Sequence, residues 1–210
     1  MSDVATDLTY EQLSEQYQDV LREIGNIGAG NATSALSNML GLKIDMAVPR
    51  VRLLEFPEIG SALGAEDEIV VGIYLEVEGG IEGSMMFVFK MASAHFLANR
   101  LMGRPDDCVE EFSDMDLSAL KEIGNIIGAS YLSALATMTN MVISPSVPYL
   151  AIDMAASILS VPAIQFGHFE DQALFVDTEM GDEVTLEGFF ILLADPAAYT
   201  KILKQLGILG

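Results

Sequence analysis

The chain has 210 residues, of which 51% are hydrophobic, and its 10 Lys and Arg stand against 31 Asp and Glu, which gives a formal net charge of -21. This charge repels phosphate backbones and anionic lipid surfaces, so neither nucleic acid nor a membrane is an expected partner. The size is typical of one globular domain or of two small fused halves. The acidity either favours a partner with a basic patch or only keeps the protein in solution.

The N-terminal residues and the single cysteine indicate where the protein resides. Residues 1–8 contain Asp3 and Asp7 and lack the basic and apolar regions of a secretory signal. Cys108 is the only cysteine, so neither an intrachain disulfide nor a Cys/His zinc cluster is expected. The uncharged stretch 123–152 is interrupted by polar residues and two prolines, which is typical of a buried core helix. We therefore expect a cytoplasmic protein with no membrane insertion.

The first predicted element is a long helix that carries Glu23 and Asn26. Thr9 followed by Gln12 fits a capping box at its start. Glu23 and Asn26 lie about 60° apart on one face of such a helix. An apolar stripe lies roughly a quarter turn away and consists of Val20, Ile24 and Ile27. The polar pair is therefore expected to flank the core face and to remain outside the core.

Two strands and a short helix are predicted to follow the long helix. The strand-like segments 69–77 and 81–89 are separated by glycines at 79–80, which indicates a hairpin. The segment 92–102 is a short helix that ends before Gly103, where a helix end favours glycine.

An acidic connection at 104–116 leads to a second long helix. The acidic residues of this connection form either a docking surface or, as is more common, part of a solvated loop. In a loop that leads into a helix, carboxylates interact favourably with the dipole at the helix N-terminus. Ser113 followed by Asp116 approximates a capping box. Glu122 and Asn125 lie on this helix with the same spacing as the first pair.

The end of the chain repeats the order of the first half. Strand-like segments at 173–176 and 184–193 flank a turn at Gly181-Asp182, and a short helix at 196–206 precedes Gly207. Strands grouped between long helices, with tight turns between them, predict antiparallel pairing.

An internal repeat relates the two halves. The sequence Glu-Ile-Gly-Asn-Ile beginning at Glu23 recurs 99 residues later at Glu122, and 12 of the 29 positions from Glu23 to Val51 are identical at that offset. We therefore predict a single domain made of two pseudosymmetric halves, at about 9–103 and 113–207. The expected fold class is α+β, a pseudo-twofold duplicated unit in which an antiparallel sheet carries two long motif-bearing helices packed side by side.

The repeated polar pair has two interpretations. An isolated Glu and Asn on a helix flank are typical of a solvated surface. Exposed faces of duplicated units drift apart more readily than cores, however, so retention of both residues in both halves indicates a function. Gly30 and Ala129 lie on the same side as the pairs and leave room for a partner protein.

Each copy of the polar pair belongs to a longer pattern, Asp19-x3-Glu23-x2-Asn26-x22-Pro49 in the first half and Ser118-x3-Glu122-x2-Asn125-x22-Pro148 in the second. These motifs resemble the two-copy signature of the CheC, CheX and FliY family of chemotaxis phosphatases. The segment from 23 to 31 is most similar to CheC. CheX-like chains are shorter. FliY-like chains carry a further C-terminal switch domain after the second repeat, whereas the sequence here stops at Gly210, just after its second repeat.

The resemblance implies a phosphatase that hydrolyses the aspartyl phosphate of phosphorylated CheY. Asn26 and Asn125 would orient the attacking water, because an amide cannot accept its proton at neutral pH. Glu23 and Glu122 would grip a lysine of the partner. Mg²⁺ would be held by the CheY substrate, so no cofactor of the chain itself is expected.

The resemblance also implies CheD as a second partner. A helix beginning Asp153-Met resembles a CheD-docking element, although its spacing fits an ordinary core helix equally well. Two alternatives to the phosphatase remain open at this point. One is a regulator of low activity that binds phosphorylated CheY or CheD, and the other is a flagellar-switch component of the FliY type.

Overall fold

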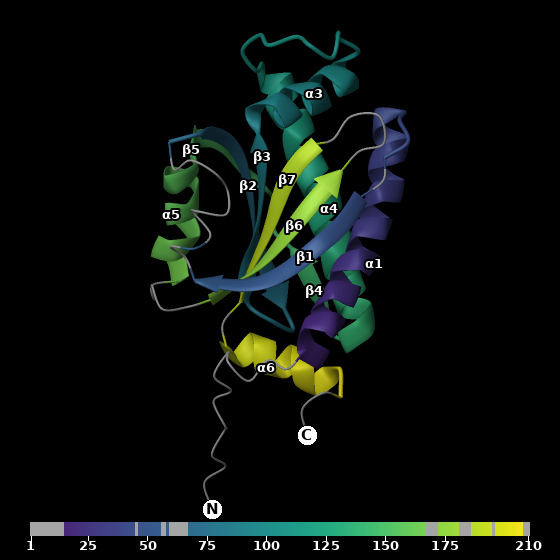
Figure 1. Ribbon diagram of the computed structural model, residues 1–210, viewed down its shortest axis with the longest axis vertical. Helices are drawn as coiled ribbons and strands as arrows, with labels where there is room; N and C mark the ends of the chain where they lie inside the picture. Colours follow the sequence, from purple (N-terminus) through teal and green to yellow (C-terminus); the bar gives the residue numbers. More distant parts are fainter. Residues whose placement is uncertain are drawn as a thin grey trace, which may run out of the picture.

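A computed structural model describes residues 15–44, 46–55, 58, 67–166, 172–180, 186–194 and 196–207 (Figure 1). The capping box predicted at Thr9 and Gln12 and the turn predicted at Gly181-Asp182 lie outside these residues. The elements are α1 (Glu15–Leu40), β1 (Met46–Glu55), β2 (Ile69–Gly79), β3 (Gly83–Lys90), α3 (Met91–Met102), α4 (Asp114–Thr139), β4 (Ile143–Pro145), β5 (Tyr149–Met154), α5 (Ala155–Phe166), β6 (Gln172–Met180), β7 (Leu186–Ala194) and α6 (Pro196–Gln205).

The strands form one seven-stranded sheet in which every pair is antiparallel, as predicted. The order is β1-β6-β7-β3-β2-β4, and β5 lies beside β4 along the same edge of β2. One strand can serve two neighbours because β2 has 11 residues. The two halves exchange their edge strands. Strand β1 of the first half pairs with β6 of the second half. Strands β4 and β5 of the second half pair with β2 of the first half.

The centre of the sheet confirms the predicted pseudo-twofold arrangement. Met86 on β3 lies opposite Ile191 on β7. Each of these residues stands three positions after the glycine of a Glu-Gly pair, at Gly83 and Gly188. Equivalent positions of the two halves therefore face each other, and the pseudo-twofold axis passes between them.

The two faces of the sheet are covered by different helices. On β2, Val71, Ile73 and Leu75 belong to a core shared with α1 and α4, whereas Val70 and Tyr74 belong to a smaller core shared with α5. This alternation follows from the period of two along a strand. Figure 1 shows α1 and α4 side by side and antiparallel on one face, with α3 and α6 closing opposite ends. None of the described helices is long and apolar enough to span a membrane.

The predicted helix ends and the first hairpin are confirmed. Gly103 and Gly207 have positive φ angles of 66° and 70° after α3 and α6. Gly79 has φ 109° at the turn between β2 and β3, a conformation that a residue with a Cβ rarely adopts. Ser113 accepts a hydrogen bond from the N–H of Asp116, and the Asp116 carboxylate accepts one from the N–H of Ser113.

Asp116 is a buried carboxylate at the start of α4. Its side chain is 1% exposed, and it forms an ion pair with Arg104. Burial alone would raise the pKa of Asp116, but hydrogen bonds from Ser113 and the charge of Arg104 outweigh it, so the pKa lies below its ordinary value. The acidic connection is therefore anchored at its end by a charged contact.

The helix predicted to begin at Asp153 begins two residues later. Asp153 and Met154 are the last residues of β5, which pairs with the start of β2, and α5 begins at Ala155. Pairing with β2 holds Asp153 and Met154 in an extended conformation. The helical spacing of Met154 and Ile158 is a local pattern and contains no information about pairing with β2. The division into halves at about 9–103 and 113–207 stays a prediction.

Candidate functional site

The orientation of α4 on the sheet determines which of its side chains face outward. A Cβ built on Gly124 would stand 2.5 Å from Cγ2 of the buried Ile73, so only glycine permits this close contact. Ile123, beside it, is fully buried. With this face against the sheet, Glu122 is exposed and Asn125 is half-buried at the flank, as the sequence predicts.

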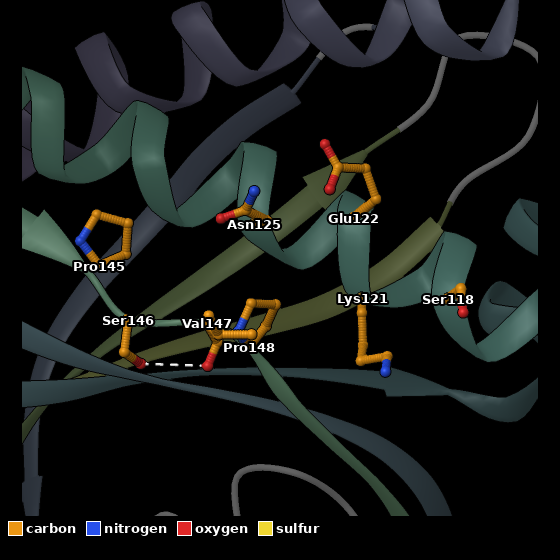
Figure 2. Close-up of a pocket in the computed structure, with 8 residues that line it drawn as sticks. All are labelled: Ser118, Lys121, Glu122, Asn125, Pro145, Ser146, Val147 and Pro148. Atoms are coloured by element: carbon orange, nitrogen blue, oxygen red, sulfur yellow. Dashed lines mark hydrogen bonds between the residues drawn. The ribbon is translucent and has the colours of Figure 1, made fainter.

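A groove runs along the flank of α4 that carries Glu122 and Asn125. Its volume is about 470 Å³. Figure 2 shows one wall formed by α4 and the other by the turn between β4 and β5. The lining residues are Ser118, Lys121, Glu122, Asn125, Pro145, Ser146, Val147 and Pro148.

The turn that forms the second wall is held to β2 by Ser146. The backbone N–H of Ser146 donates to the carbonyl of Glu76 at 2.9 Å, and the N–H of Glu76 donates to Oγ of Ser146, also at 2.9 Å. The hydroxyl thus takes the place of a strand carbonyl as acceptor. It also donates to the carbonyl of Val147 at 3.2 Å, the contact dashed in Figure 2.

The edge of the sheet bulges at this turn. Pro145 pairs with Val77 and Tyr149 pairs with Tyr74, so residues 146–148 face only two residues of β2. A bulge leaves backbone groups without ladder partners. Pro148 fits such a position because proline has no N–H to leave unpaired.

All four signature positions of the second half meet in this groove. Ser118, Glu122 and Asn125 come from successive turns of α4, and the 22-residue spacing brings Pro148 to the opposite wall. Lys121, Pro145, Ser146 and Val147 also line the groove. Sequence reasoning did not assign these four residues to the site.

The missed residues differ in the signal that they left in the sequence. Val147 is identical to Val48 at the offset of 99, so the internal repeat marks this position. Ser146 corresponds to Ala47, so the internal repeat does not mark Ser146.

The first-half motif is presented on α1 in a similar way. Glu23 and Asn26 are exposed, while Ile24 is buried. Ile27, which belongs to the predicted apolar stripe, is 38% exposed and therefore lies only partly against the core. The side chain of Val20 lies outside the described residues.

The surface around the first motif is open. A Cβ on Gly30 would meet nothing within 4 Å, and Ala129 at the equivalent position of α4 is exposed. The side chain of Pro49 lies outside the described residues, but the backbone of β1 has a register shift between Ala47 and Arg50. The sheet edge is therefore irregular at the Val-Pro pair of both halves.

The structure does not bring Asp153 into the groove. Asp153 is exposed on β5 at the edge of the sheet, where Oδ1 accepts a hydrogen bond from the N–H of Met154 at 2.7 Å. Any role of Asp153 is therefore separate from that of Glu122 and Asn125.

The groove contains groups suited to binding a polar partner. The carboxylate of Glu122 accepts hydrogen bonds and attracts a cation, whereas the amide of Asn125 both donates and accepts. The groove is open to solvent, so both side chains can be reached by another molecule.

Comparisons with known proteins agree on one family. A model described as "CheC-like family" matches residues 18–52 and 115–152, the two segments that contain the motifs. The CheY-P phosphatase CheC of Bacillus subtilis (strain 168) is 36% identical over 203 residues, which cover 94% of this chain and 97% of that relative.

Solved structures share the fold. FliY of Thermotoga maritima is similar with a TM-score of 0.77 and 25% identity, over 93% of this chain and 98% of that chain. A chain in the CheX-CheY-BeF3-Mg complex from Borrelia burgdorferi is similar with a TM-score of 0.51 and 17% identity, over 80% of this chain and 96% of that chain.

Proposed function

The chain belongs to the CheC family, and on that premise we propose that it is a phosphatase that hydrolyses the aspartyl phosphate of a CheY-type response regulator. The observation that carries this proposal is the gathering of Ser118, Glu122, Asn125 and Pro148 on one open groove. Support also comes from the B. subtilis relative, which is named a CheY-P phosphatase, and from the B. burgdorferi complex, which joins CheX to CheY.

In this proposal Asn125 positions the attacking water. Hydrolysis of an acyl phosphate needs a water molecule in line with the leaving carboxylate. The amide oxygen accepts a hydrogen bond from that water and the amide N–H₂ donates to a phosphoryl oxygen, without either group taking a proton. Asn125 is half-buried in an open groove, so its amide is accessible to the partner. Asn26 has the same task on α1, where it is exposed.

Glu122 and Glu23 dock the partner. A carboxylate would repel a phosphoryl group, so its favourable role is to pair with a lysine beside the regulator's phosphorylation site. Glu122 lies one helical turn from Asn125, which brings the amide towards the acyl phosphate when the pair forms. The Mg²⁺ that neutralises the phosphoryl oxygens belongs to the regulator and arrives with it as part of the substrate.

The proposal is tested by the rate at which phosphorylated CheY loses phosphate. Wild-type protein in substoichiometric amounts is expected to turn over many equivalents, whereas a regulator that only binds would not. The double variant Asn26→Ala with Asn125→Ala is expected to lose about 100-fold or more in kcat, because the water is no longer aligned. Asn38→Ala, an exposed asparagine farther along α1, is the matched control and keeps wild-type activity. A double variant as active as wild type would refute the mechanism.

CheD is proposed as a second partner, with Asp153 as its contact residue. The support is that Asp153 is exposed at the sheet edge, away from the groove, so CheD and phosphorylated CheY have separate places to bind.

A further inference from the structure

Val147 is an apolar side chain that the fold exposes at the groove. It is 80% exposed although it lines the same groove as Glu122 and Asn125. Packing in the core therefore does not explain why this position holds valine. The first half also has valine here, at Val48, whereas the preceding position differs between the two halves.

The backbone presents Val147 outward in a fixed conformation. It stands in the bulge of the sheet edge, between Pro145 and Pro148. Ser146 ties the bulge to β2 by hydrogen bonds with both backbone groups of Glu76. Bulges that redirect a side chain are frequent beside active sites. An apolar group held in place before binding costs little conformational entropy when a partner covers it.

The same irregularity occurs in the first half. On β1, Ala47 pairs with Glu179 and Arg50 pairs with Asp177, so Val48 and Pro49 together face one residue of β6. Both halves thus bulge at a Val-Pro pair. A purely structural bulge needs no valine, because its backbone geometry is set by the proline and by the pairing on either side.

We propose that Val147 is a contact residue for the phosphorylated regulator, which covers this side chain with an apolar patch beside its phosphorylation site. This inference rests on the proposed function. The occupant follows from the groove itself, because a partner that pairs a cation with Glu122 and receives Asn125 must close over Val147 on the opposite wall. Val147 then supplies affinity and specificity, while Asn125 supplies the chemistry.

A second exposed valine offers a matched control. Val142 is 86% exposed and precedes β4, but it does not line the groove. Replacement of either valine by serine leaves the net charge unchanged. Both substitutions are made in the Asn26→Ala background, so that only the groove of the second half acts.

The experiment measures steady-state dephosphorylation of CheY and the affinity for CheY carrying BeF3 and Mg²⁺. Val147→Ser is expected to raise KM and Kd by about 5- to 10-fold, with kcat changed by less than about twofold, because apolar area is no longer buried at the interface. Val142→Ser is expected to leave all three constants unchanged. Equal effects of the two substitutions, or none from Val147→Ser, would overturn the inference.

Two further measurements separate the possible failures. Loss of activity in Asn26→Ala with Asn125→Ala, together with an unaffected Val147→Ser, refutes the contact role and leaves the proposed function intact. Activity retained by the double asparagine variant refutes the function. A smaller apparent mass of Val147→Ser in sedimentation, relative to Val142→Ser, would assign the valine to contacts between copies of this chain and also overturn the inference.

Discussion

Gly28 of α1 lies so close to Tyr131 of α4 that a Cβ on the glycine would stand 2.9 Å from the Cα of the tyrosine. This contact sets the register of the antiparallel pair, and it places Asn26 near the level of Ser133. Eight residues separate Ser133 from Asn125, so the two asparagines are about 12 Å apart along the helix axes at a rise of about 1.5 Å per residue. The groove at Asn125 also lies on the side of α4 away from α1 (Figure 2).

Separate locations predict that the two motifs act independently. The rate of Asn26→Ala and the rate of Asn125→Ala are expected to add up to roughly the wild-type rate, whichever half is the more active, because two sites that turn over substrate independently each contribute their own rate to the total. The measurement is single-turnover and steady-state hydrolysis of phosphorylated CheY. Near-complete loss of activity in both single variants would show instead that one reaction needs both asparagines.

Two helical glycines are expected to respond in opposite directions to alanine. Gly124→Ala forces a Cβ against Ile73 and should destabilise the protein by about 1–3 kcal/mol. Gly30→Ala meets open space and should stabilise the protein by about 0.5–1 kcal/mol, since alanine favours the helix. Thermal unfolding of the two variants measures both effects. A destabilising Gly30→Ala would contradict the packing described for α1.

Asp116 is expected to make stability depend on acidity. Its pKa is lowered in the folded state, so its contribution is fully present above the unfolded pKa of about 4 and is lost as the pH falls through the folded value. Asp116→Asn should cost about 2–3 kcal/mol at pH 7, where Arg104 loses its charged partner. The difference from wild type should shrink below about pH 4.

Denaturant unfolding at several pH values provides the measurement for Asp116. Asp114→Asn, an exposed position in the first turn of the same helix, is the control and should change stability by less than about 1 kcal/mol. A constant difference between Asp116→Asn and wild type from pH 7 to pH 3 would show that folding does not lower the pKa of Asp116.

Ser146 is expected to hold the second wall of the groove. Ser146→Ala removes the acceptor of the Glu76 N–H and should cost about 1 kcal/mol. The amide of Glu76 should then exchange its hydrogen faster, which NMR detects. Ser144→Ala, at an exposed position of β4, should leave that amide protected. Unchanged exchange in Ser146→Ala would mean that the rest of the sheet edge fixes the turn.

Asp153 is expected to affect CheD alone. Asp153→Ala should weaken CheD binding by about tenfold or more if this carboxylate pairs with a charged group of CheD, and hydrolysis of phosphorylated CheY should be unaffected. Asp107→Ala, an exposed aspartate between α3 and α4, serves as the control. Calorimetric titration with CheD distinguishes the two variants, and equal affinities would remove Asp153 from the interface.

Local signals in the sequence were sufficient for much of the fold. Gly79 and Gly103 have positive φ angles where the sequence places a turn and a helix end, and Ser113 caps α4 as its spacing to Asp116 predicts. The outward position of Asn125 follows from helical periodicity alone. Each of these features depends on residues a few positions apart.

Features that depend on distant segments could not be predicted in the same way. Asp153 has the local pattern of a helix start, yet it joins a strand because the edge of β2 is available for pairing. The wall of the groove depends on a contact between Ser146 and Glu76, which are 70 residues apart. No local pattern marks a serine whose hydroxyl replaces a backbone carbonyl, so this part of the site required the structure.

The exchange of edge strands bears on how the molecule is assembled. Strand β1, at one edge of the sheet, is synthesised early, whereas its partner β6 is synthesised late. During translation β1 therefore has no pairing partner until β6 has been synthesised. After cleavage of the linker that follows α3, the two fragments are expected to stay associated, because β1 pairs with β6 and β3 pairs with β7 across the cut.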